Sequence, residues 1–137
     1  MSDNSIYKDV LLDHYRNPRN RGQLADADVV SRGSNPRCGD DIEVGVNFQE
    51  GGLCNVMFRG RGCSVCLASA SMMTEVVNGK STQEAHQLVE SMKAWFSADG
   101  DRPSESLQAL EAVRSHSARK RCVLLAWEAL GDALSAE

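Results

Sequence analysis

Residues 41–60, DIEVGVNFQEGGLCNVMFRG, decide the fold class of this chain. From Ile42 onwards apolar and polar side chains alternate, which is the pattern of a β-strand with one buried face. The QEGG sequence that follows provides the glycines of a tight turn, and LCNVMFRG provides a return strand. Cys54, Val56 and Phe58 alternate on that strand, so burial statistics favour Cys54 as a core residue. The stretch predicts a β-hairpin with one face against a core.

The segments on either side of the hairpin extend the sheet and begin the helices. Upstream, ADVVSRG at residues 27–33 predicts a third, short strand that Gly33 and Pro36 end. Downstream of Cys63 the sequence changes to helix formers and small residues, and an Asn-Gly pair at Asn78 gives a C-cap signal. Strands therefore come first and helices afterwards.

Helical periods account for most of the remaining chain. The last of them carries an amphipathic stripe that includes Val123, Trp127 and Leu130. Over residues 1–137 we expect a single domain of the α+β class, with a small antiparallel sheet of about three strands and helices packed on one face. The further helices are predicted at 4–16, from 81 onwards, around 105–114 and at 118–135.

Size and charge limit the function before any motif does. The chain has 137 residues, enough for one domain with a continuous core, and its formal net charge of −4 argues against a nucleic-acid partner. The N-terminal sequence MSDNSIYKDV lacks the features of a signal peptide, and no stretch is long enough to span a bilayer. We therefore expect a cytoplasmic protein with no membrane partner. Thiols stay reduced there, so its five cysteines are expected to be metal ligands, catalytic thiols or buried residues.

Three cysteines stand at the boundaries of predicted elements. Cys38 lies in the loop before the long strand, Cys63 begins a helix, and Cys122 is expected in the opening turn of the last helix. A thiol at a helix N-terminus has a lowered pKa, which favours the thiolate that metals and electrophiles require. Asp40 follows Cys38 across a glycine and can turn its carboxylate toward the same point. Three thiolates and a carboxylate form a tetrahedral set for Zn²⁺, and thiolate-rich sets also suit iron-sulfur clusters.

Cys66 allows more than one interpretation. With Cys63 it forms a C-x-x-C pair, which is typical of thiol-disulfide redox motifs and of half a zinc knuckle. A redox pair would leave Cys38 and Cys122 without a role, and a zinc knuckle would need a second close pair, so we expect Cys66 in the core. The histidines show no ligand spacing, and His14 is expected to be a satisfied, half-buried residue.

Three motifs carry a resemblance to a known family. NPRCGDD at 35–41, GRGCSVCLASASMMTEVVNGKS at 60–81 and RKRCVLLAWEAL at 119–130 resemble the three cysteine motifs of the IscU/SufU iron-sulfur assembly proteins, which are related to the N-terminal domain of NifU. The resemblance implies that the metal ligands are four residues, and that Cys54 and Cys66 are not among them. The implied ligands are Cys38, Asp40, Cys63 and Cys122.

The sequence is more similar to the SufU branch than to the IscU branch. IscU-type proteins have a histidine immediately before the third cysteine, where this chain has Arg121, and they carry a Leu-Pro-Pro-Val-Lys stretch that is absent here. The additional residues SADGDRPSESL, at 97–107, are also a SufU-like feature. A SufU-like protein is therefore expected.

The resemblance implies a zinc protein that accepts persulfide sulfur from a SufS-like cysteine desulfurase, and passes it to downstream cluster assembly or acceptor proteins. It implies a sulfurtransferase-like partner rather than a stand-alone enzyme, and it leaves open a transient [2Fe-2S] cluster on the same thiolates as a scaffold. Cys38 is the expected sulfur acceptor, because Gly39 lets its loop move away from the metal. The alternatives are a thioredoxin-like oxidoreductase that uses Cys63 and Cys66, and a purely structural zinc module.

Overall fold

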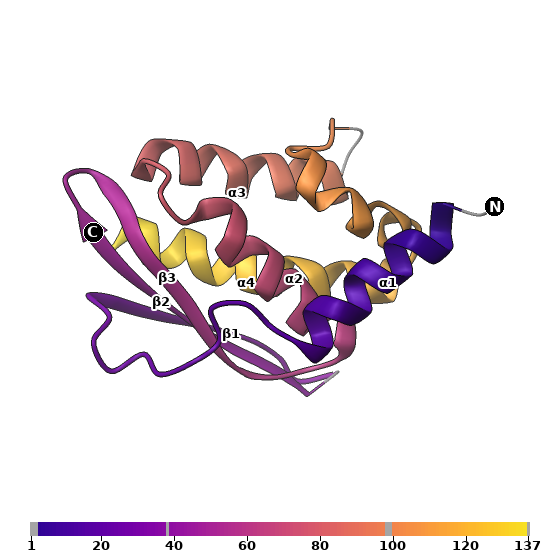
Figure 1. Ribbon diagram of the computed structural model, residues 1–137, viewed down its shortest axis with the longest axis horizontal. Helices are drawn as coiled ribbons and strands as arrows, with labels where there is room; N and C mark the ends of the chain where they lie inside the picture. The colour runs from indigo at the N-terminus through magenta and orange to yellow at the C-terminus, as the bar shows by residue number, and fades with distance from the viewer. Residues whose placement is uncertain (1–2, 38, 98–99, 137) are drawn as a thin grey trace.

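A three-stranded antiparallel sheet in the order β1-β2-β3 forms one layer of the protein (Figure 1). The computed structural model describes residues 3–37, 39–97 and 100–136. A two-residue turn joins the central strand to its neighbour, and both turn residues, Glu50 and Gly51, have positive φ, at 53° and 77°. Positive φ at both positions is the geometry of a type I′ hairpin, so the predicted hairpin is confirmed. The strands are β1 (Val29–Asn35), β2 (Asp40–Gln49) and β3 (Gly52–Arg61).

The helices gather on one side of this sheet (Figure 1). The predicted α+β fold is therefore confirmed, although the segment after residue 104 is a 3₁₀-helix. None of the helices in the described part of the chain is long and apolar enough to cross a membrane. The elements are α1 (Asp3–Arg16), α2 (Ser64–Val77), α3 (Thr82–Ser97), the 3₁₀-helix η1 (Glu105–Ser115) and α4 (Ser117–Ser135).

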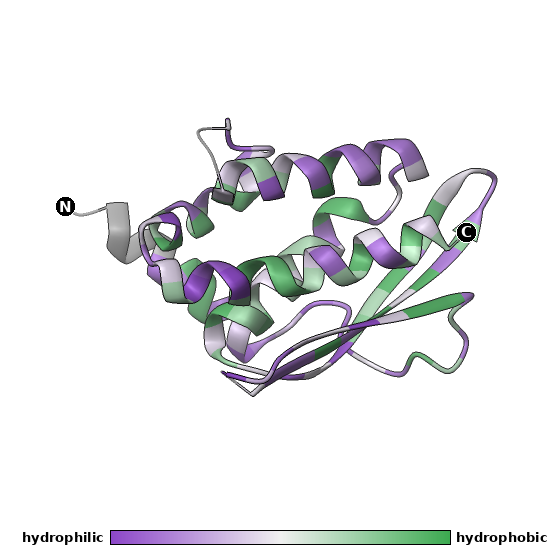
Figure 2. Cartoon of the chain, turned by 180° about the vertical axis from the view of Figure 1, so that it is seen from behind, coloured by the Kyte–Doolittle hydropathy of each residue, from purple (hydrophilic) through white to green (hydrophobic). Residues whose placement is uncertain are grey.

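The core lies between the sheet and helices α2 and α4. Ile42, Val44 and Phe58 contribute from the strands, and Trp127 contributes from α4, all with fully buried side chains. Helix α2 is buried along most of its length, which explains its small residues and the absence of charge before Glu75. Figure 2 shows hydrophobic residues along the strands and helices that border this core. The core therefore holds α2 and α4 firmly against the sheet and against each other.

Strand β1 continues past its predicted end at Gly33 and reaches Asn35. A Cβ atom at Gly33 would lie 3.1 Å from the backbone oxygen of Leu125 on α4, so the glycine is a point of close approach between strand and helix. Of the two residues expected to end the strand, only Pro36, which lacks a backbone N–H, lies beyond its last residue.

The predicted burial of Cys54 is wrong, because its side chain is exposed. The pairing of β2 with β3 shifts at this point: Asn47 faces Asn55, whereas the next residue, Phe48, faces Leu53. Cys54 is the extra residue of this β-bulge, so Leu53 and Val56 both turn inward with two residues between them. Simple alternation could not reveal the shift.

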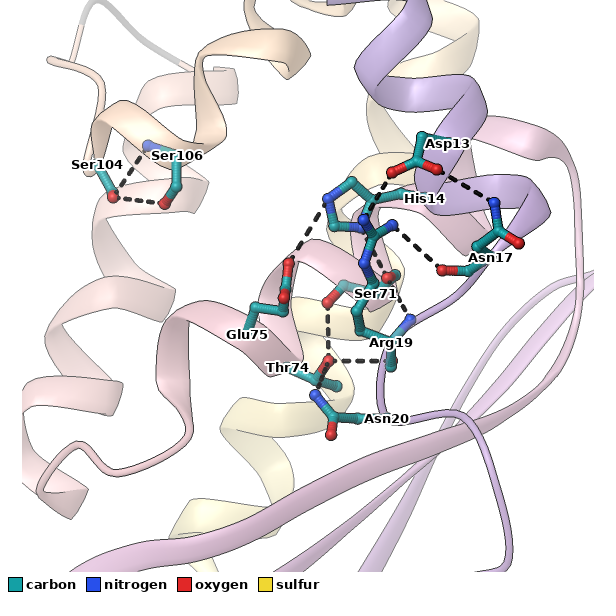
Figure 3. A network of polar contacts seen from close by, with 10 residues as sticks. All are labelled: Asp13, His14, Asn17, Arg19, Asn20, Ser71, Thr74, Glu75, Ser104 and Ser106. Carbon is teal, nitrogen blue, oxygen red and sulfur yellow. Dashed lines mark hydrogen bonds and ion pairs between the residues drawn. The ribbon is translucent and has the colours of Figure 1, made fainter.

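A polar network joins the end of α1 to α2 (Figure 3). His14 is 8% exposed, and its Nδ1 lies 2.7 Å from the hydroxyl oxygen of Ser71. That oxygen also accepts a hydrogen bond from the backbone N–H of Arg19 at 2.8 Å, and His14 Nε2 lies 3.6 Å from a carboxylate oxygen of Glu75. The expectation that His14 is a satisfied residue is confirmed, and its side chain is buried more deeply than expected.

Candidate metal centre

Asp40, Cys63 and Cys122 meet at one point, although they come from three different elements. One ligand atom from each lies within 4.8 Å of the other two. Asp40 begins β2, Cys63 is the N-cap of α2, and Cys122 lies on α4. The structure thus brings together three of the four predicted ligands, while Cys38 lies outside the described residues.

The carboxylate of Asp40 is buried in this site, with only 1% of the residue exposed. Its Oδ1 accepts a hydrogen bond from the backbone N–H of Cys63 at 2.9 Å. Its Oδ2 is the one buried side-chain polar atom in the described part of the chain that has no hydrogen-bond partner. A buried carboxylate oxygen without a partner is costly unless a cation is present. Two thiols and this oxygen are ligand types that Zn²⁺ prefers, so the residues fit a zinc ion.

Gly62 allows the close approach of Asp40 to the start of α2. A Cβ atom at Gly62 would lie 2.9 Å from Oδ1 of Asp40 and 3.0 Å from the sulfur of Cys66. Gly62 was not among the residues expected at the site. Its signal is the Gly-Arg-Gly sequence immediately before Cys63, where close packing excludes a side chain.

Cys122 does not lie in the opening turn of α4, so this part of the prediction is wrong. The helix begins at Ser117, which places Cys122 in its second turn, where the effect of the helix dipole has faded. Burial raises the pKa of the Cys122 thiol, and contacts with Asp40 and Cys63 raise it further. A neighbouring positive charge is therefore needed to hold this sulfur as a thiolate.

Arg119 provides positive charge beside both thiols. The pKa of its guanidinium is raised mainly by the charge of Cys63 and by a hydrogen bond to that sulfur, with Cys122 contributing less. Because Arg119 and Cys122 are three residues apart on α4, they lie on the same side of the helix. Arg119 therefore supplies the positive charge that a thiolate at Cys122 requires.

Cys66 has no exposed surface and is not part of this group of ligands. The prediction that it lies in the core is confirmed. A thioredoxin-like use of Cys63 and Cys66 is not favoured, because a redox partner would need access to the pair.

A hollow of about 800 Å³ opens beside the centre. It is bounded by the residues on either side of the β1 end and by the first turns of α4, and it carries two arginines, Arg37 and Arg121. Both arginines are exposed, so the surface next to the candidate centre is basic. The lining residues are Asn35, Pro36, Arg37, Ser117, Ala118 and Arg121.

Fold and site together define a class of protein in which a small α+β domain presents a cysteine-rich metal centre. The chain belongs to the family of the NifU-like N-terminal domain, whose model matches residues 6–136.

Relatives with curated names agree with this assignment. The chain is 35% identical to the zinc-dependent sulfurtransferase SufU of Bacillus subtilis, over 97% of this chain and 92% of that protein. It is also 35% identical to the iron-sulfur cluster assembly scaffold protein IscU of Streptococcus pyogenes, over 96% of this chain and 84% of that protein.

A solved structure has the same fold. The N-terminal part of a NifU-like protein from Brucella abortus superposes with a TM-score of 0.87 at 25% identity, covering 96% of this chain and 94% of that one. The resemblance found in the three motifs is thus confirmed at the level of the family.

Proposed function

We propose that this protein is a zinc-dependent acceptor of sulfur in iron-sulfur cluster assembly, working with a cysteine desulfurase in the cytoplasm. The observation that carries the proposal is the buried carboxylate of Asp40, which has one oxygen within 4.8 Å of two cysteine sulfurs and an Oδ2 without a hydrogen-bond partner. The naming of a Bacillus subtilis relative as a zinc-dependent sulfurtransferase supports it.

The proposed ligands are Cys38, Asp40, Cys63 and Cys122. The proximity of ligand atoms of Asp40, Cys63 and Cys122 supports three of them, and the motif that Cys38 shares with Asp40 supports the fourth. Bound zinc would keep the thiols deprotonated and shielded. Gly39 has a φ of 73° and no atom within 4 Å of the position of a Cβ, so the backbone next to Cys38 adopts a conformation that favours glycine.

The proposed chemical step is the transfer of one sulfane sulfur to Cys38. The thiolate of Cys38 attacks the terminal sulfur of a persulfide on the desulfurase, and a new sulfur–sulfur bond forms. The sulfur–sulfur bond of the donor breaks, and the donor cysteine leaves as a thiolate. The exchange needs no external oxidant or reductant. Arg119, which already contacts Cys63 and Cys122, supplies positive charge for the thiolates at this centre.

The basic hollow beside the centre is the proposed docking surface for the desulfurase. Arg37 and Arg121 line it and are exposed, so they are available to an acidic surface on the partner. In this arrangement the protein is a partner of an enzyme rather than an enzyme by itself. Sulfur on Cys38 then passes to downstream assembly or acceptor proteins.

A desulfurase assay tests the proposal. The protein is incubated with a SufS-like desulfurase and cysteine, without reductant, and the added sulfur is located by peptide mass spectrometry. We expect turnover to rise, persulfide on Cys38, and loss of the stimulation in Cys38→Ser. Sulfur found only on Cys66 or Cys122, or a desulfurase indifferent to the protein, would overturn the proposal.

A scaffold role is a second candidate, because relatives such as the IscU of Streptococcus pyogenes are named as scaffold proteins. The same thiolates and Asp40 suit a [2Fe-2S] cluster. Anaerobic reconstitution with iron and sulfide, followed by absorption spectroscopy, tests this role. A cluster that forms on the wild type and not on Cys122→Ser would support it, and failure to form any cluster would exclude it.

A further inference from the structure

One hydroxyl group joins the two helices associated with Cys63 and Cys122. Ser69 on α2 is fully buried, and its Oγ donates a hydrogen bond to the backbone carbonyl of Val123 on α4 at 2.7 Å. The same Oγ accepts a hydrogen bond from the indole Nε1–H of Trp127 at 3.2 Å. The hydroxyl thus makes one bond as donor and one as acceptor, and both reach the same helix.

The chemistry of the three groups fixes the direction of both bonds. An indole N–H can only donate and a carbonyl can only accept, so the hydroxyl proton must point to Val123. Trp127 lies four residues after Val123, on the same face of α4, and in a regular helix its backbone N–H donates to the Val123 carbonyl as well. The two lone pairs of that carbonyl serve both donors. Both hydrogen bonds of Ser69 can therefore form together at only one rotation and one axial position of α4 relative to α2.

This junction lies close to the candidate ligands along both helices. Val123 directly follows Cys122, and Ser69 follows Cys63 by six residues, which is about 9 Å along a helix. Apolar packing is not directional, so an interface without the hydroxyl would tolerate a small slide of one helix along the other. A hydrogen bond weakens steeply when its geometry is lost. Metal coordination needs ligand distances held within about 0.2 Å.

We propose that Ser69 is a positioning residue for the metal centre, whose hydrogen bonds to Val123 and Trp127 set the register of α4 on α2. That register holds Cys122 at the separation from Cys63 that a metal ion requires. The inference rests on the zinc centre of the proposed function. Ser69 acts through the backbone and the indole of α4, since both of its hydrogen bonds go to Val123 and Trp127.

The test compares Ser69→Ala with a matched control, Ser71→Ala. Ser71 lies on the same helix, is equally buried, and makes its side-chain hydrogen bonds to His14 and Arg19 instead of α4. Both variants lose one buried hydroxyl, so a general loss of stability affects both. We expect Ser69→Ala to lose zinc to a chelator about tenfold faster than the wild type, which is the lower end of the effect of removing a hydrogen bond to a metal ligand itself.

Cobalt substitution gives the readout that stability alone would not change. In Co²⁺-loaded protein the thiolate-to-metal absorption bands should shift in Ser69→Ala and stay at the wild-type position in Ser71→Ala. Ser69→Thr keeps the hydroxyl and should return both the bands and the zinc release rate toward the wild type. Equal zinc release from the two alanine variants, or an unshifted spectrum in Ser69→Ala, would overturn the positioning role of Ser69 and leave the proposed zinc centre unaffected. A wild-type protein that binds neither metal would overturn the proposed centre as well.

Discussion

The backbone N–H of Cys63 donates to Oδ1 of Asp40 at 2.9 Å, and this bond ties the first residue of β2 to the N-cap of α2. Only one carboxylate oxygen is used in this way. The other, Oδ2, is buried without a hydrogen-bond partner. Asp40 therefore combines a structural contact with an available ligand atom, and substitutions can separate the two.

Asp40→Asn should keep the hydrogen bond from Cys63 and lose the negative charge, whereas Asp40→Ala loses both. We expect both variants to release zinc faster than the wild type, by at least the roughly tenfold that removal of an outer partner of a metal ligand costs. Only Asp40→Ala should also be less stable as metal-free protein. Chelator competition and urea unfolding measure the two effects. An unchanged rate of zinc release in Asp40→Ala would show that Asp40 has a structural role and is not a metal ligand.

Cys122→Ser should lose the zinc, while Cys66→Ala should retain one zinc per chain. Cys122 is part of the group of ligand atoms, and Cys66 is buried outside it. Because binding to the native state stabilises it, loss of zinc should lower the free energy of unfolding by about 2.7 kcal/mol when free zinc is 100 times its dissociation constant. Elemental analysis and thermal unfolding check both variants. Zinc retained in Cys122→Ser and absent from Cys66→Ala would reverse the assignment.

Cys54 should react rapidly with a thiol reagent in the zinc-loaded protein, and Cys66 should be protected. Cys54 is exposed at the bulge, and Cys66 has no exposed surface. Brief alkylation followed by peptide mass spectrometry gives the order of reaction. Cys54→Ser should remove the fast phase and leave the zinc content unchanged. Fast labelling of Cys66 in native protein would contradict the buried position.

His14 should make the protein less stable in mild acid. Nδ1 of His14 lies 2.7 Å from the hydroxyl oxygen of Ser71, which also accepts a hydrogen bond from the backbone N–H of Arg19 (Figure 3). Burial, together with the charge of Arg19, lowers the pKa of His14 below 6.5. The folded protein therefore favours the neutral ring. The stability that it contributes is complete above pH 6.5 and is lost as the pH falls toward the lowered value.

Urea unfolding at pH 7.5 and 5.5 checks this expectation in the zinc-loaded protein. His14→Gln should show a smaller loss between the two values than His116→Gln, because His116 is exposed and precedes α4, whereas the network joins α1 to α2. Any pH dependence of zinc binding is common to both variants. The same loss in both would show that His14 does not control the transition.

Periodicity was sufficient to predict the hairpin and the helices, because burial on one face leaves a repeat of two or of about 3.6 residues. It could not place Cys54, since the bulge changes the repeat by one residue within the strand. The start of α4 was predicted within one residue, at 118 instead of Ser117, but Cys122 lies in the second turn of the helix rather than in its opening turn.

Part of the candidate centre could also be predicted, although not from periodicity. Its ligands stand at element boundaries and in recognisable motifs, so Asp40, Cys63 and Cys122 could be named from the sequence. The contacts of Ser69 could not, since its partners are 54 and 58 residues away and leave no local pattern. Such contacts depend on how two helices pack, which no short stretch of sequence specifies.

The bulge at Cys54 has a consequence for variation in chain length. Removing a residue from the middle of a strand normally turns every later side chain to the opposite face. Here Phe48 pairs with Leu53 and Asn47 pairs with Asn55, so removal of Cys54 would leave a continuous ladder with the same inward residues. Natural or engineered sequences that are one residue shorter in this hairpin should therefore keep the same core and the same centre.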